Sequence, residues 1–428
     1  MRIESFDLLD SKDKFHQKAL HWSGQFDEIS FFNSNGMSDQ WGRFESVLAV
    51  KALFSLRANK NVLVQLEQFL ESHPAQFIPG FLSYDIKNEI EELQTTGKDH
   101  LEFPEAFFFV PAITVRLAKD KVYIEAEDPL KIYQAISDTE IPPAKTTISV
   151  QMQSRWTRSE YIKAFENTQA HIQRGDIYEV NLCQEFFAED ADISPVEVYH
   201  RLNAVSPTPF SSFFKVGHHF IISASPERFL AKRNGKLISQ PIKGTARRGA
   251  NSVEDKQIVA DMLQSQKEIA ENVMIVDLVR NDLTRSALPG TVEATHLFEI
   301  QSFEQVHQMI STITCLQDPQ ISNVGVFKNT FPAGSMTGAP KIAAMQICDQ
   351  IEVCKRSIYA GSIGYFDTIC DEFDFNVVIR SLLYNKEKQY LSLHTGGAIT
   401  NQASAEQEYQ ECLLKASAVF KALDTNLR

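Results

Sequence analysis

The chain has 428 residues, of which 43% are hydrophobic and 23% are charged. This composition is typical of a globular protein and excludes a collagen-like, coiled-coil or disordered chain. The length predicts two or three domains, or one large composite domain. The formal net charge of -13 at pH 7 opposes binding to nucleic acid, and we find no basic stripe that would offset it.

The N-terminus and the cysteines favour a cytoplasmic protein. The segment MRIESFDLLDSKDKFHQKAL lacks the apolar core of a signal peptide. The most apolar stretch, Ala106 to Val115, is about half of the ~20 residues that a membrane-spanning helix needs, so we interpret it as buried β-structure. None of the six cysteines belongs to a CxxC pair, which indicates buried thiols in a reducing compartment.

The first part of the chain mixes short aromatic and β-branched runs with helical stretches. Ser46 to Leu56 is expected to be helical, and Lys119-Asp120-Lys121 is expected to be a tight turn between two strands. The polar segment Asp138 to Ser154, with two consecutive prolines, predicts a boundary. We therefore predict domains over residues 1–145 and 154–423, packed into one composite body.

After this boundary the spacing of apolar residues predicts helices over Ser159–Gly175, Val253–Leu278, Ala339–Ile351 and Ala405–Leu423. Strand-like runs lie at Tyr178–Phe187, Ser211–Val216, Phe220–Ala224, Arg228–Lys232, Ser357–Phe366, Phe373–Leu383 and Tyr390–Leu393. Helices and strands mix without strict βαβ alternation. The pattern predicts an α+β fold in which large, mainly antiparallel β-sheets form a two-layer core with helices packed outside.

Two pairs of glutamates are spaced three residues apart on predicted helices. Glu268 and Glu271 share one helix face, and Glu408 and Glu411 share another. If the two faces meet, four carboxylates converge and require a cation, and hard oxygen ligands of this kind suit Mg²⁺. Considered separately, each pair is better explained as a solvated helix face, because glutamate pairs at this spacing are common.

Two further segments carry candidate catalytic side chains. Lys243 lies in SQPIKGTARRG, followed by a glycine and by Thr245. Partial burial would lower the pKa of Lys243 and make it a nucleophile, whereas an ordinary surface lysine is the alternative. Glu227, in SASPERFL, is a candidate general acid with a raised pKa, or else a solvated loop residue.

Two glycine-containing segments could bind anions. FPAGSMTGAPK carries Ser335 and Lys341, and its Thr337 can cap the helix that starts near Ala339-Pro340, where exposed N–H groups bind anions well. Its spacing does not match a Walker A loop. In LHTGGAIT, Gly396 and Gly397 could present backbone N–H groups to a carboxylate, although a plain β-turn is the alternative.

In this order and at these spacings the motifs resemble those of the chorismate-utilising enzymes, which include anthranilate synthase component I, aminodeoxychorismate synthase component I and the isochorismate and salicylate synthases. The resemblance is strong from Tyr161 to Leu423 and thinner before it. It is carried by GDIYEVNLCQEF, SASPERFL, PIKGTARRG, KEIAENVMIVDLVRNDL, FEQVHQMIST, FPAGSMTGAPK, YAGSIGYFD, FNVVIRS and EYQECLLKA.

The resemblance implies roles for the residues that match. Glu271 and Glu411 would bind Mg²⁺ directly, and Glu268 and Glu408 would reach the ion or its waters. The ion would hold the ring carboxylate of chorismate. The enolpyruvyl carboxylate would be gripped by Tyr359 and Arg380 with the backbone N–H groups of Gly396 and Gly397. The remaining substrate-binding candidates are His307, close to the ring, and Thr245, Ser335 and Lys341.

The segment PIKGT resembles aminodeoxychorismate synthase component I, because anthranilate synthase usually has alanine at the position of Lys243. The resemblance implies that Lys243 attacks ring carbon C2 while Glu227 protonates the departing C4 hydroxyl. Ammonia then enters at C4 and expels the lysine, giving 4-amino-4-deoxychorismate for 4-aminobenzoate and folate synthesis. The alternatives are anthranilate synthase component I and, from a different class, a non-catalytic partner subunit.

Some features depart from the family pattern or are absent from the sequence. Glu179 stands where glutamine is usual in the family. The isochorismate and salicylate synthases use a lysine near this position, so Glu179 argues against that branch. Ala398 replaces a third glycine. We find no glutaminase motif, so ammonia is expected from a separate glutamine amidotransferase subunit or from free ammonium. Several relatives hold tryptophan in the first domain, and Ser34 and Pro209–Ser211 lie in matching segments; a closed hydrophobic core is the alternative.

Overall fold

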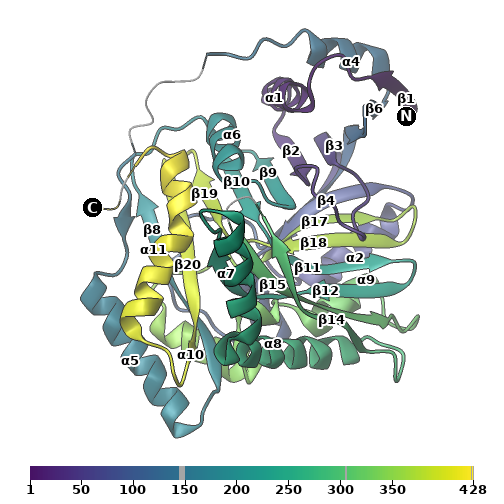
Figure 1. Ribbon diagram of the computed structural model, residues 1–428. Helices are drawn as coiled ribbons and strands as arrows, with labels where there is room; N and C mark the ends of the chain where they lie inside the picture. The colour runs from purple at the N-terminus through teal and green to yellow at the C-terminus, as the bar shows by residue number, and fades with distance from the viewer. Residues whose placement is uncertain (144–149, 304–305, 426, 428) are drawn as a thin grey trace.

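The structure is a computed structural model that describes residues 1–143, 150–303, 306–425 and 427. Its named strands pair antiparallel in a network that forks at β5 (Ala106–Ala118), which pairs with strands of both arms. Beyond β5 lie β6 (Lys121–Ala126) and β1 (Arg2–Asp7). These two strands gather with α1 (Lys12–Ser23) and α4 (Pro129–Ser137) near the N-terminus (Figure 1).

The first arm of the sheet carries the strands on which much of the candidate site is built. In spatial order from β5 it contains β3 (Ser46–Ala58), β2 (Glu28–Asn33), β9 (Phe210–Val216), β10 (His219–Ser225), β19 (Ser381–Asn385), β20 (Tyr390–Thr400) and β8 (Glu179–Ala188). The short strands β7 (Gln153–Ser154) and β16 (Gly338–Ala339) pair with β8.

The second arm also starts at β5. It contains β4 (Phe77–Leu82), β17 (Ser362–Asp367), β18 (Glu372–Val377), β11 (Arg228–Arg233), β12 (Lys236–Gln240) and β15 (Val306–Leu316), the last of which also pairs with β13 (Ile242–Arg247) and β14 (Glu293–Ser302). The pairs β2–β9 and β4–β17 join the two predicted domains. The predicted boundary at residue 145 lies outside the described residues, as do residues 144–149 of the predicted linker.

The core lies between the two arms and beneath the helices. The largest hydrophobic cluster includes side chains from both arms, and Phe81 of β4 meets Phe214 of β9 edge to face with 5.4 Å between ring centroids. A second cluster, which includes Phe31 and Ile222, covers the other face of the first arm together with α1, α6 (Pro195–Val205) and α11 (Ala405–Ala422). The prediction of an antiparallel α+β fold with outer helices is confirmed.

The remaining helices lie around these sheets. They are α2 (Val62–Ser72), α3 (Lys87–Ile90), α5 (Arg158–Arg174), α7 (Ser252–Gln264), α8 (Gln266–Thr284), α9 (Asn323–Thr330) and α10 (Lys341–Ile351), with single 3₁₀ turns at Tyr84–Ile86 and Gly334–Met336. The prediction of α5 is confirmed: Thr157 and Glu160 form a capping box, and Gly175 ends the helix with φ of 85°. Within the described residues, no helix is long and apolar enough to cross a membrane.

Two predicted strands differ in extent: Ser357–Phe366 is a strand only from Ser362, and Phe373–Leu383 is divided into β18 and β19. Three further predictions about secondary structure are wrong. Ser46 to Leu56 is a strand: both faces of its first half, residues 46–50, are covered, and the consecutive residues Val47 and Leu48 enter different hydrophobic clusters. The helix predicted over Val253–Leu278 is broken at Ser265, whose backbone is extended and whose hydroxyl caps α8 by accepting from the Glu268 N–H.

The third difference concerns the segment LHTGGAIT. The strand predicted to end at Leu393 continues to Thr400, so Gly396 and Gly397 lie inside β20 rather than in a turn. They pair with Cys183 and Leu182 of β8. A Cβ at Gly396 would overlap the carbonyl oxygen of Leu182, which explains why glycine occupies a position in the interior of a strand.

Candidate active site

The predicted catalytic lysine lies at an irregularity in β13. The register of the β13–β15 pair shifts between Ile242 and Thr245, and such a bulge turns a side chain out of the regular ladder. The Lys243 ammonium donates a hydrogen bond to the carboxylate of Glu179, at the start of β8. Both residues are buried, with exposed fractions of 8% and 5%.

The charge state of Lys243 differs from the expectation. Burial opposes the charged form, but the charge and hydrogen bond of Glu179 outweigh burial and raise the pKa of Lys243, with smaller contributions from Glu271 and Glu227. The prediction that burial lowers this pKa is therefore wrong for the free protein. The contributions also place Lys243 in one electrostatic environment with the candidate acid and a candidate metal ligand.

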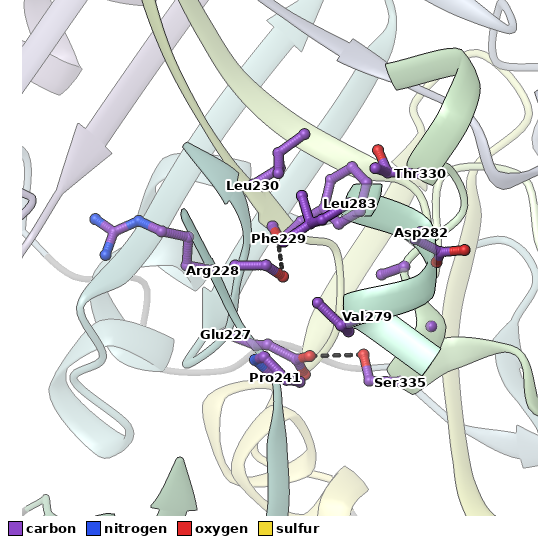
Figure 2. A pocket seen from close by; sticks show the side chains of 13 residues that line it. Glu227, Arg228, Phe229, Leu230, Pro241, Val279, Asp282, Leu283, Thr330 and Ser335 are labelled. Atoms are coloured by element: carbon purple, nitrogen blue, oxygen red, sulfur yellow. Dashed lines mark hydrogen bonds between the residues drawn. The ribbon is translucent and has the colours of Figure 1, made fainter. Parts of the chain in front are cut away.

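Glu227 lies in the turn between β10 and β11, and its side chain is buried. The Ser335 hydroxyl donates to Glu227 Oε1 at 2.6 Å. Figure 2 shows these two side chains facing each other at the wall of a cavity of about 20 Å³, with Pro241 and Val279 beside them. Burial raises the pKa of Glu227 to about 7, against the opposing effects of Ser335 and Lys243. This carboxyl group can therefore hold a proton close to neutral pH.

The four glutamates of the predicted metal site come from α8 and α11. The charge of Glu408 interacts with those of Glu411 and Glu271, and that of Glu271 interacts with Glu268. Burial, reinforced by Glu411, raises the pKa of Glu408 to about 7. Charges on the two helices therefore interact, and the convergence of all four carboxylates on one cation stays a prediction.

Several contacts indicate how these carboxylates would receive a cation. Glu271 Oε1 and Glu408 Oε2 are buried without a hydrogen-bond partner. A Cβ at Gly244 would overlap the carboxylate of Glu268, and one at Gly397 would overlap that of Glu408. Within the described ranges, no three acidic, histidine or cysteine side chains are already gathered closely enough to hold a metal ion. The donor set still fits Mg²⁺, because carboxylate oxygens are its preferred protein ligands.

Arg380 and Tyr359 lie near the same helices. Arg380 lies between β18 and β19 with φ of 52°, and within the described part of the chain no side chain forms a hydrogen bond or ion pair with its guanidinium. Its charge interacts with Glu411 and Tyr359. The Tyr359 ring stacks on His394 with 5.3 Å between ring centroids. An unpaired guanidinium beside a buried phenol is suited to binding a carboxylate.

The two glycines of β20 face opposite edges of the strand. The Gly396 carbonyl accepts from Lys415 Nζ at 2.7 Å, and the N–H of its partner Cys183 donates to Glu352 instead of to β20. Gly396 therefore directs its N–H away from β8, whereas that of the next residue, Gly397, points toward β8. Of the two predicted N–H donors, only that of Gly396 faces an edge where a substrate carboxylate could bind.

Of the other three predicted substrate-binding residues, two are engaged within the protein and one is exposed. His307 is buried, with one hydrogen bond between Nε2 and Asp255 at 2.9 Å and another between Nδ1 and Ser302 at 2.8 Å. Lys341 Nζ donates to Asp282 at 2.9 Å and to the Thr330 carbonyl at 2.7 Å. Thr245 is exposed opposite Gln308 of β15. Substrate contact by these three residues stays a prediction.

Sequence reasoning noticed Glu179 only as a departure from a pattern and missed its contact with Lys243. The two residues are 64 positions apart, and no local spacing connects them. The segments matched to tryptophan binding do meet: Ser34, Pro209, Phe210 and Ser211 line one cavity of about 60 Å³ beside Arg228. Tryptophan binding itself stays a prediction.

Comparison with known proteins shows the family to which this chain is similar. The family model of chorismate binding enzymes matches residues 5–421. An aminodeoxychorismate synthase component 1 of Salmonella typhimurium is 35% identical over 81% of this chain and 76% of its own length. An aminodeoxychorismate synthase of Streptomyces griseus is 40% identical over 66% of this chain, which spans only 38% of that relative.

Among solved structures, anthranilate synthase component I of Streptococcus pneumoniae superposes with a TM-score of 0.77 at 26% identity. The match covers 90% of this chain and 93% of that one. The family match extends over nearly all of the chain, and the fold agrees with it. The chain therefore belongs to the family of chorismate binding enzymes.

Proposed function

We propose that this chain converts chorismate and ammonia to 4-amino-4-deoxychorismate, the precursor of 4-aminobenzoate in folate biosynthesis. The observation that carries the proposal is the position of Lys243, buried and in electrostatic contact with Glu227 and Glu271. A buried amine beside a protonated acid supplies the nucleophile and the proton donor that two successive displacements require. The aminodeoxychorismate synthases among the relatives support the same reaction.

The first displacement joins the enzyme to the substrate. Neutral Lys243 Nζ attacks ring carbon C2, both conjugated ring double bonds shift, and the C4–oxygen bond breaks. Glu227 gives its proton to the departing hydroxyl, which leaves as water. The pKa of about 7 for Glu227 keeps a substantial fraction of the acid protonated at neutral pH, which this step needs.

The second displacement releases the product. Ammonia attacks C4, both ring double bonds shift back, the C2–nitrogen bond breaks, and the electrons of that bond return to Lys243. The new ammonium at C4 loses one proton to the Glu227 carboxylate, which restores the acid. Two displacements, one through C2 and one at C4, replace one difficult exchange of hydroxide for ammonia.

Substrate binding would use the carboxylates and cations around Lys243. Mg²⁺ held by Glu271 and Glu411, with Glu268 and Glu408 nearby, would neutralise the ring carboxylate and polarise the ring. Arg380, Tyr359 and the Gly396 N–H would hold the enolpyruvyl carboxylate. Ammonia would come from a separate glutamine amidotransferase subunit or from free ammonium.

Anthranilate synthase is the second candidate function, because anthranilate synthase component I shares this fold at 26% identity. Incubating the chain with chorismate, Mg²⁺ and ammonium, and identifying the product by mass, separates the two. Aminodeoxychorismate is the expected product, whereas direct formation of anthranilate would refute the proposal. Unchanged chorismate, even with an amidotransferase partner, would instead favour a non-catalytic subunit.

A matched pair of lysine variants tests the covalent step. Lys243→Ala should abolish formation of aminodeoxychorismate. Lys131→Ala, which removes an exposed lysine of α4, should leave it unchanged. Full activity of Lys243→Ala would show that the lysine is not the nucleophile.

A further inference from the structure

The proposed nucleophile must lose a proton before it can attack, and the contacts of Lys243 restrict where that proton can go. Within residues 1–143, 150–303 and 306–425, the hydrogen-bond acceptor in contact with Nζ is the Glu179 carboxylate. Glu227 and Glu271 also act on the charge of Lys243, but neither forms a hydrogen bond with it in the described part of the chain. The proton therefore has a direct route to Glu179.

The position of Glu179 is fixed from two sides. Its backbone lies in β8 between β20 and β16, opposite Thr400 and Ala339. A Cβ at Gly338 would overlap the carbonyl oxygen of Glu179, so the β16 segment lies tightly against it. The bulge in β13 brings Lys243 to this clamped carboxylate. A nucleophile and a base in hydrogen-bond contact, with the base held by its own surroundings, is the arrangement of activated nucleophiles in general.

We propose that Glu179 is the proton acceptor that converts the Lys243 ammonium into the attacking amine. This inference rests on the proposed function. The Lys243 N–H bond breaks and its proton forms the Glu179 O–H bond, which turns an ion pair into a neutral pair. The amine then bonds to C2. When the amine is expelled in the second displacement, it takes the proton back from Glu179, so the pair returns to its starting state.

Burial makes this transfer feasible. Both side chains are less than a tenth exposed, and removing two charges from water is costly even when the charges are paired. A bound substrate would exclude further water from the pair. The neutral pair then carries no desolvation penalty, whereas release of the proton to bulk water would leave an unpaired buried carboxylate.

Glu179→Gln tests the proposal because the amide has nearly the same shape and can still contact Lys243, but accepts no proton. With saturating chorismate, Mg²⁺ and ammonium, we expect kcat for aminodeoxychorismate to fall about 100-fold or more, the range of a lost general base. The dissociation constant of chorismate, measured by calorimetry, should change less than about threefold. Glu179→Asp keeps a carboxylate and should recover part of the lost rate.

A second readout isolates the step itself. Without ammonium, the wild-type chain mixed with chorismate and quenched in acid should gain the mass of chorismate less one water on the Lys243 peptide. Glu179→Gln should form this adduct about 100-fold more slowly. A purely structural role for Glu179 would instead weaken chorismate binding and thermal stability together, without rescue by aspartate.

The outcomes separate this inference from the proposed function. If the wild type makes aminodeoxychorismate and Glu179→Gln makes it within about threefold of that rate, the role of Glu179 is refuted and the function stands. The same holds if Glu179→Asp is no faster than Glu179→Gln. If the wild type makes anthranilate or no product, the proposed function fails, and the role of Glu179 fails with it.

Discussion

The proton on Glu227 provides the sharpest test of the catalytic assignment. Its pKa of about 7 arises mainly from burial, and the Ser335 hydroxyl opposes that rise by donating to Oε1 at 2.6 Å. Because the general acid must be protonated, kcat should fall about tenfold per pH unit above that value. Ser335→Ala removes a hydrogen bond to a charged group, which contributes about 1.5–3 kcal/mol. The pKa of Glu227 should therefore rise by about one to two units, and the decline should begin at a correspondingly higher pH.

The assay measures kcat for aminodeoxychorismate between pH 6 and 9. Total ammonium is adjusted at each pH so that free ammonia stays constant. Glu227→Gln is the matched control: it should lose about 100-fold or more in rate, and the remaining rate should lack the decline above neutral pH. The assignment of Glu227 is refuted if Glu227→Gln keeps that decline. It is also refuted if Ser335→Ala leaves the decline where it is in the wild type.

Three further predictions follow from other parts of the fold. Burial raises the pKa of Asp85 to about 7, so stability should fall as pH rises from about 4 to 7, and chemical denaturation of Asp85→Asn should lack this loss. Gly397→Ala should weaken Mg²⁺ binding measured by calorimetry, because the added methyl overlaps the Glu408 carboxylate; unchanged affinity would contradict the metal assignment. Phe214→Ala should cost about 3–5 kcal/mol in the free energy of unfolding, since its ring joins the two arms, and a loss below about 1 kcal/mol would argue against that role.

Local sequence signals predicted much of the fold. Thr157, Glu160 and Gly175 mark the two ends of α5 because capping depends on neighbouring residues alone. The prediction for Ser46 to Leu56 is wrong for the opposite reason: whether an apolar run is a helix or a strand depends on what covers it, and the first half of β3 is covered on both faces. The break at Ser265 also escaped notice, since the apolar spacing continues across it.

The candidate site was predictable where one helix or one motif carries the signal. The pairs on α8 and α11 follow from a spacing of three residues, and charges on the two helices interact, whereas a shared cation stays a prediction. The contact between Glu179 and Lys243 depends on strands that are distant in sequence and on a bulge in β13, so no local pattern contains it. It also reverses the expected shift of the Lys243 pKa.

The strand pairs β2–β9 and β4–β17 make the folding of each half of the chain depend on the other half. A fragment that began after the predicted linker would leave one edge each of β9 and β17 without the partners that cover them here. Exposed edges of this kind pair with other chains and cause aggregation. Each half thus covers a strand edge of the other half. A gene split at this point should yield folded protein only when both fragments are made together.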